Sequence, residues 1–163
     1  MSQIQRLYRL LISAASSLQS PFLLLVRLAW GYQMHLAGAG KLHDLGKVTG
    51  FFTQLGIPLP GANAVFIAVL EFAGGLLFAL GLGSRLIALL FAGDMVVAYI
   101  LADREALTSI FSDPDKFYAA TPYTFLFAAL IVLIFGPGKF SLDALLAKRF
   151  AAGAASPKES SPA

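Results

Sequence analysis

Three ionisable residues stand inside apolar stretches of the chain that are long enough to cross a membrane. Arg27, Glu71 and Asp94 each fall in a different stretch of this kind. An unpaired charge in the hydrocarbon core costs at least about 2.5–3.5 kcal/mol, so such a residue needs a partner, water or neutralisation. Intramembrane charges of this type form proton relays and ligand sites, and they also form clamps that only hold helices in register.

The depths of these residues predict that they meet. At a rise of about 1.5 Å per residue, Arg27 lies about 8 Å, Glu71 about 16 Å and Asp94 about 12 Å from the same membrane face. An extended arginine side chain covers the difference, which predicts an Arg27–Glu71 pair with Asp94 as its modulator. A site of this kind suits a proton relay or a bound quinone. A purely structural clamp stays the alternative.

Histidine offers a weaker signal. His35 lies about two helical turns beyond Arg27 and could hydrogen-bond a quinone carbonyl, or it could be an ordinary packed histidine. A metal site built from His35, His43 and Asp44 has no recognised ligand spacing, so we predict none. The sequence contains no Ser–His–Asp grouping, phosphate-binding loop or CxxC motif, and catalytic residues therefore stay unknown.

The composition is that of a membrane protein. Of the 163 residues, 58% are hydrophobic and 13% are charged, against about 25% charged in soluble domains. The pI is near 9.3, but the basic residues stand at the ends of apolar stretches and not in runs with aromatics. A nucleic-acid partner is therefore not predicted. The chain has no cysteine, which excludes disulfides and thiol redox chemistry.

The apolar blocks predict an all-α integral membrane protein, a bundle of four transmembrane helices with short interfacial helices. The spans are expected at about 22–40, 62–82, 86–102 and 117–136. A tight turn at residues 83–85 makes the second and third spans antiparallel neighbours. Apolar residues recur at helical spacing within the 41–61 loop, which predicts a short interfacial helix there. Gly74 and Gly75 are expected at helix contacts.

The two ends of the chain are expected to lie outside the bundle. Residues 1–20 carry one apolar stripe and a basic polar side, which predicts an amphipathic helix in the membrane interface. Ser20-Pro21 reads as an N-cap followed by the first helical position, so the bundle domain is placed at 21–143. Residues 144–163 are predicted to be a basic and then disordered tail.

The charge distribution predicts the orientation. If both termini are cytoplasmic, the inner side holds more basic residues than the outer side, which holds Lys41, Lys47, Arg104 and Lys116. The positive-inside rule then favours a multi-pass protein with its N- and C-termini inside. The inner set is Arg6, Arg9, Arg85, Lys139, Lys148, Arg149 and Lys158.

The order of several motifs resembles the DoxX family of small four-helix membrane proteins. The resemblance covers about residues 22–143 and is carried by Arg27, by GAGKL at 38–42, by FFTQLGIPLP in the first loop, by EFAGGLLFALGLGSR at 71–85 and by GPGKFSLD at 136–143. It implies a bacterial inner-membrane bundle associated with oxidoreductase systems, including quinone-linked ones. It also carries over Arg27, Lys41, Glu71, Gly75 and Asp143 as family positions, and Lys41 joins the candidate site on this ground alone.

These features favour a subunit or accessory of a quinone-linked membrane oxidoreductase, without a clear enzymatic activity of its own. The expected partners are the lipid bilayer and a membrane or peripheral redox protein, and the bundle could also self-associate. No cofactor is evident from the residues, and quinone is the one the resemblance suggests. A non-catalytic scaffold that docks a partner and a small transporter stay open as alternatives.

Overall fold

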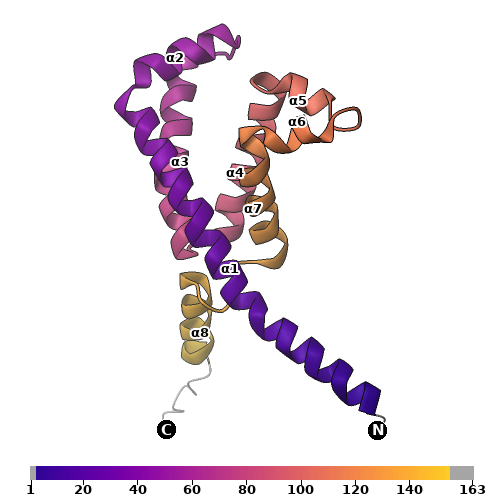
Figure 1. Ribbon diagram of the computed structural model, residues 1–163. Coiled ribbons are helices and arrows are strands. Elements are labelled where there is room, and N and C mark those ends of the chain that lie inside the picture. The colour runs from indigo at the N-terminus through magenta and orange to yellow at the C-terminus, as the bar shows by residue number, and fades with distance from the viewer. Residues whose placement is uncertain (1–2, 155–163) are drawn as a thin grey trace, which may run out of the picture.

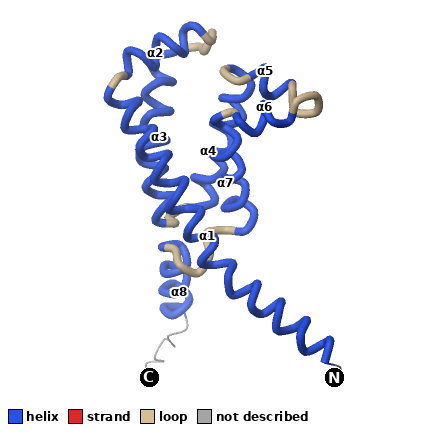
Figure 2. The backbone as a smooth tube through the Cα atoms, in the orientation of Figure 1, coloured by secondary structure: helices blue, strands red, loops and turns tan. Residues whose placement is uncertain are grey.

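The computed structural model describes residues 3–154, and these are helical apart from turns and short connections (Figures 1 and 2). The described part contains no strand, which confirms the all-α class. Its helices are α1 (Gln3–His43), α2 (Leu45–Gln54), α3 (Pro60–Leu80), α4 (Ser84–Leu101), α5 (Arg104–Thr108), α6 (Pro114–Ala119), α7 (Thr121–Phe135) and α8 (Leu142–Ala154).

Within the described residues, three helices are long and apolar enough to cross a membrane: α1, α3 and α4. The predicted second and third spans match α3 and α4 to within a turn. The predicted fourth span begins too early, because Ala120 is extended and separates α6 from α7. The apolar α7 has 15 residues, or about 22 Å, so the count of four spans stays a prediction.

The predicted helix start at Ser20-Pro21 is wrong. Pro21 lies inside α1, which continues through it without a break. The Ser20 hydroxyl does not cap a helix; it accepts a hydrogen bond of 3.2 Å from the backbone N–H of Lys139. Residues 3–19 are exposed throughout, and this half of α1 extends away from the bundle (Figure 1). Its place in the membrane interface stays a prediction, and residues 1–2 lie outside the described part.

The predicted disordered tail is also partly wrong, because residues 151–154 continue α8. This helix begins within the bundle domain predicted at 21–143, and its first turn contains Asp143. The predicted disorder of residues 155–163 lies outside the described residues.

The long helices form two pairs, α1 with α3 and α4 with α7 (Figure 1). Glycines bring the backbones of the first pair into contact. A Cβ on Gly31 would lie 2.8 Å from the carbonyl oxygen of Gly75, and a Cβ on Gly38 would collide with the backbone at Phe72. Gly74 faces the second pair, with the Phe91 ring 3.1 Å from where its Cβ would be. Such close approach at small residues is typical of membrane helices.

The two pairs meet near the turn between α3 and α4. At this turn Gly81 and Gly83 have φ of 73° and 59°, a region in which a side chain would be strained. Beside it lies a shared hydrophobic core drawn from α1, α3, α4 and α7. Its buried members are Val26, Met34, Phe78, Ile87, Ala88, Phe91, Ala92, Met95, Ala128, Ala129 and Val132.

Candidate functional site

Glu71 pairs with Lys41, and the predicted pairing with Arg27 is wrong. The Lys41 ammonium donates a hydrogen bond to Glu71 Oε2, with the side chain of Glu71 4% exposed and that of Lys41 31% exposed. The contact follows from the packing of α1 on α3. Gly38 lies against the backbone at Phe72, and residues three apart share a helix face, so Lys41 is held above Glu71.

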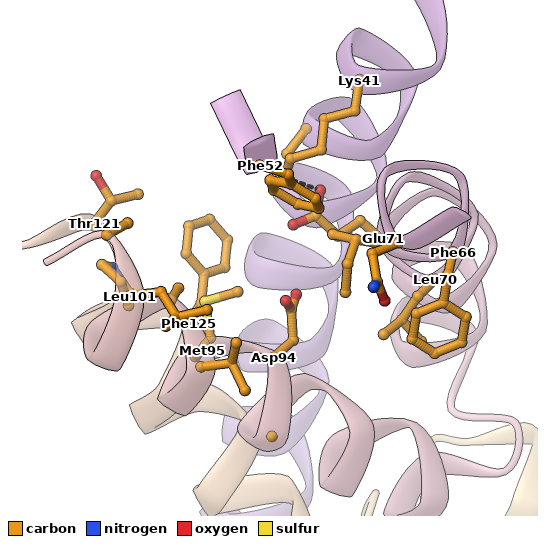
Figure 3. A pocket seen from close by; sticks show the side chains of 18 of the residues that line it. Lys41, Phe52, Phe66, Leu70, Glu71, Asp94, Met95, Leu101, Thr121 and Phe125 are labelled. Carbon is orange, nitrogen blue, oxygen red and sulfur yellow. Dashed lines mark hydrogen bonds and ion pairs between the residues drawn. The ribbon is translucent and has the colours of Figure 1, made fainter. Parts of the chain in front are cut away.

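Asp94 approaches the same place from α4. Its carboxyl group points into the space beside the Lys41–Glu71 pair (Figure 3). Its Oδ2 is buried and has no hydrogen-bond partner among the described residues. A buried polar atom without a partner is rare and costly, so this oxygen is a free position for a ligand or a proton.

These three residues form the polar part of a large cleft between the two helix pairs (Figure 3). The cleft has a volume of about 670 Å³, which is within the roughly 300–1,000 Å³ of small-molecule sites. Most of its wall is apolar, including the aromatic rings of Phe51, Phe52, Phe66 and Phe125. The remaining polar residues of its wall are Asn63, Asp103 and Thr121.

Arg27 belongs to a different place, at the opposite end of α3. It is fully buried, and its Nη2 donates to the backbone carbonyl of Phe140. Its guanidinium also lies against Gly81, where any Cβ would collide with it. Gly81 is ten residues beyond Glu71, or about 15 Å along a helix. This distance explains why Arg27 does not reach Glu71.

Asp143 completes this second cluster from the start of α8. Its carboxylate accepts hydrogen bonds from the backbone N–H groups of Gly83 (2.8 Å) and Ser84 (2.9 Å), which begin α4. Burial raises the pKa of the Asp143 carboxyl, but the hydrogen bonds from Ser84 and Gly83 and the charge of Arg27 outweigh it, so the pKa lies below its usual value. The Arg27–Asp143 cluster therefore fixes α1, the α3–α4 turn and α8 to one another.

His35 contributes to neither cluster. Its Nδ1 lies 2.8 Å from the carbonyl oxygen of Phe72, and its ring stacks on the Phe72 ring with centroids 4.3 Å apart. A carbonyl only accepts, so this contact places the proton on Nδ1. His35 does not line the cleft, and its role in the structure is to join α1 to α3.

Sequence reasoning missed the part that Lys41 plays and the aromatic wall of the cleft. The sequence feature that could have indicated this part is the position of Lys41 one turn after Gly38. Both residues lie on the face of α1 that packs against α3. The pair Phe51-Phe52 in the short α2 was the signal for the wall. Among the described residues, no group of three His, Asp or Glu side chains is placed to hold a metal ion.

Together these features define a small helical membrane protein with one closed charge cluster and one that opens into an apolar cleft. A family model described as DoxX matches residues 22–104, a stretch that includes Arg27, Lys41, Glu71 and Asp94. The chain therefore belongs to the DoxX family of membrane proteins. No curated protein and no solved structure matches it.

Proposed function

We propose that the cleft binds a quinone and that the protein is a subunit or accessory of a quinone-linked oxidoreductase system. One observation carries the proposal: a largely apolar cleft has an ion pair and an unpartnered carboxyl oxygen at one place in its wall. A quinone has a flat apolar ring and polar oxygens at its edge. The phenylalanine rings would hold the ring, and the polar residues would orient the oxygens.

Each polar residue has a role in this proposal. Lys41 has three N–H donors, of which Glu71 uses one, so it can donate to a quinone carbonyl. Asp94 offers the free carboxyl oxygen that could exchange a proton with the reduced quinol. Glu71 keeps the ammonium charge of Lys41 in place. The sequence has no cysteine and therefore no thiol that could carry electrons. In this proposal the electrons come from a partner redox protein, either membrane-bound or peripheral.

We further propose that the protein lies in the bacterial inner membrane as a multi-pass protein with both termini in the cytoplasm. Two observations support this orientation. The first residues of α1 and the last residues of α8 lie at the same end of the molecule (Figure 1), and the basic residues Arg6, Arg9, Lys148 and Arg149 belong to these two helices. In this orientation the Lys41–Glu71 pair lies in the outer half of the membrane.

The test is stabilisation of the purified protein by quinones. Ubiquinone and menaquinone analogues should raise its melting temperature, because a ligand that binds only the folded state stabilises it. Glu71→Gln should remove this shift. Glu105→Gln, at a carboxylate whose side chain is 83% exposed and does not line the cleft, should keep it. If no quinone shifts the melting temperature of the wild-type protein, the proposal is wrong.

A second function, a membrane scaffold that docks a partner, is favoured by the N-terminal half of α1. Residues 3–19 are exposed along their whole length and include Ile4, Leu7, Tyr8 and Leu11 at helical spacing. If docking is the function, removal of residues 1–19 should abolish co-purification of the redox partner from native membranes. Glu71→Gln should then leave both co-purification and redox activity intact.

A further inference from the structure

One wall of the cleft is exposed on the outside of the helix bundle. Along α4, Leu89, Gly93, Val97 and Leu101 recur every fourth residue and form a single row on one helix face. All four residues line the cleft, and all four are also exposed on the surface of the protein. Across from them on α3, Phe66 also lines the cleft and is 57% exposed. The cleft therefore has a side opening between α3 and α4.

The depth of this opening determines what lies outside it. Gly93 is nine residues beyond Ser84, the first residue of α4, which places it about 14 Å along the helix. That is close to the middle of the hydrocarbon core, which is roughly 30 Å thick. An exposed surface at this depth meets acyl chains, so the opening connects the cleft with the bilayer interior.

Gly93 makes a gap in the middle of the row. A Cβ on Gly93 would have no atom within 4 Å, whereas a Cβ on Gly38 or Gly75 would collide with a neighbouring helix. Helix packing therefore does not require a glycine at position 93. Helix stability does not favour one either, because glycine weakens a helix. The gap lies next to Asp94, whose carboxyl group points into the cleft (Figure 3).

We propose that the gap at Gly93 is a lateral port through which an amphiphile with one apolar chain enters the cleft from the bilayer. Its polar ring lies at Lys41, Glu71 and Asp94. Its chain leaves between Leu89 and Val97 and continues among the lipids. This inference rests on the proposed quinone site and deepens it, because it assigns Gly93 as the residue that selects ligands carrying a chain over the bare ring.

The test compares two probes on three proteins in nanodiscs of one lipid composition. The probes are decylubiquinone and the same quinone ring without its chain. The proteins are the wild type, Gly93→Leu and the control Gly40→Leu, which fills another exposed helical glycine with no atom near its Cβ but outside the cleft. Partition of the probes into lipid is common to all three proteins and cancels in the ratios of their dissociation constants.

We expect Gly93→Leu to weaken decylubiquinone about tenfold, because the leucine side chain fills the gap through which the alkyl chain leaves and overpacks it, with the bare ring unaffected. The decylubiquinone affinity of Gly93→Ala should lie between those of the wild type and Gly93→Leu, and the affinity of Gly40→Leu should match that of the wild type.

Melting temperatures show whether each variant is folded, and the alanine variant keeps the test valid if the leucine variant is not. Equal decylubiquinone affinity in wild type and the folded Gly93 variants overturns the port alone. No binding of either probe to the wild type overturns the proposed function together with it.

Discussion

The molecule has two clusters of charged residues. They differ in which groups bind the charged side chains and in whether these side chains face the cleft. In the Arg27–Asp143 cluster, the start of α4 donates backbone hydrogen bonds to Asp143, and Arg27 donates one hydrogen bond to the Phe140 carbonyl. The Nε and Nη1 atoms of Arg27 have no partner among the described residues, but the cluster lies outside the cleft. In the other cluster, Lys41 and Glu71 satisfy one another, Asp94 keeps a free oxygen, and all three face the cleft. A charge closed in by the backbone holds the fold, whereas a charge facing a cavity is available to a ligand.

The largest expected effect is on the closed cluster. Arg27→Met should destabilise the protein by about 3 kcal/mol, because it leaves the Phe140 carbonyl without its donor and Asp143 without a nearby cation. Thermal unfolding in detergent measures this loss. Arg85→Met serves as the control, since within residues 3–154 the hydrogen bond of Arg85 is a long one of 3.5 Å to the backbone carbonyl of Ile134. A folded Arg27→Met protein with wild-type stability would show that the closed cluster is not a clamp.

The next largest effect is on the cluster of Lys41, Glu71 and Asp94, and it shows whether Lys41 stabilises the protein by pairing with Glu71. Lys41→Met should cost about 2 kcal/mol, because it leaves Glu71 buried without its partner. The double variant Lys41→Met/Glu71→Gln should recover most of this loss, since it no longer buries a charge without a partner. Chemical or thermal unfolding of the single and double variants provides the comparison. If the double variant is no more stable than the single one, Lys41 contributes through something other than Glu71.

The capping role of Asp143 gives a smaller, pH-dependent effect. Its pKa is lowered in the folded protein, so its contribution is complete above the unfolded value of about 3.9 and is lost as the pH falls below it. Asp143→Ala should therefore cost about 1 kcal/mol at pH 7, as expected for the loss of a helix cap. The difference in melting temperature between wild type and variant should shrink below about pH 4. A difference that persists unchanged in acid would rule out the carboxylate as its source.

The smallest effect is expected at Asp94. Asp94→Asn keeps the size of the side chain, and Oδ2 has no partner to lose among the described residues. Stability should therefore change by less than about 0.5 kcal/mol. If Asp94 exchanges a proton with the ligand, the pH dependence of quinone binding should become flatter in the variant. Titrations of quinone at several pH values measure this, and an unchanged profile would remove Asp94 from that role.

The sequence predicted the helices well because long apolar blocks and a glycine turn leave few alternatives. It also placed Glu71 and Asp94 near one another, because a short turn joins their helices. It predicted Arg27 as the partner of Glu71, whereas the partner is Lys41. That choice depends on the register of α1 against α3, which the contacts at Gly31, Gly38 and Gly75 determine. Counting residues from a membrane face does not contain this information.

Helix ends were predicted least well, for a similar reason. Proline after serine is a common helix start, but here Ser20 is used by the backbone of Lys139, and α1 continues through Pro21. The role of the motif at 136–143 depends on tertiary structure, because its Asp143 caps α4, a helix distant in sequence. Local patterns predict which residues can cap or start a helix, and tertiary contacts decide which of them do.

The most direct test of the distinction between the two clusters is quinone binding by the Lys41→Met/Glu71→Gln double variant. Isothermal titration with decylubiquinone should show binding to the wild type and none to the double variant, while the melting temperature of the double variant without ligand stays close to that of the wild type. Undiminished binding by this folded variant would show that the polar wall of the cleft is not the ligand site and would contradict the account.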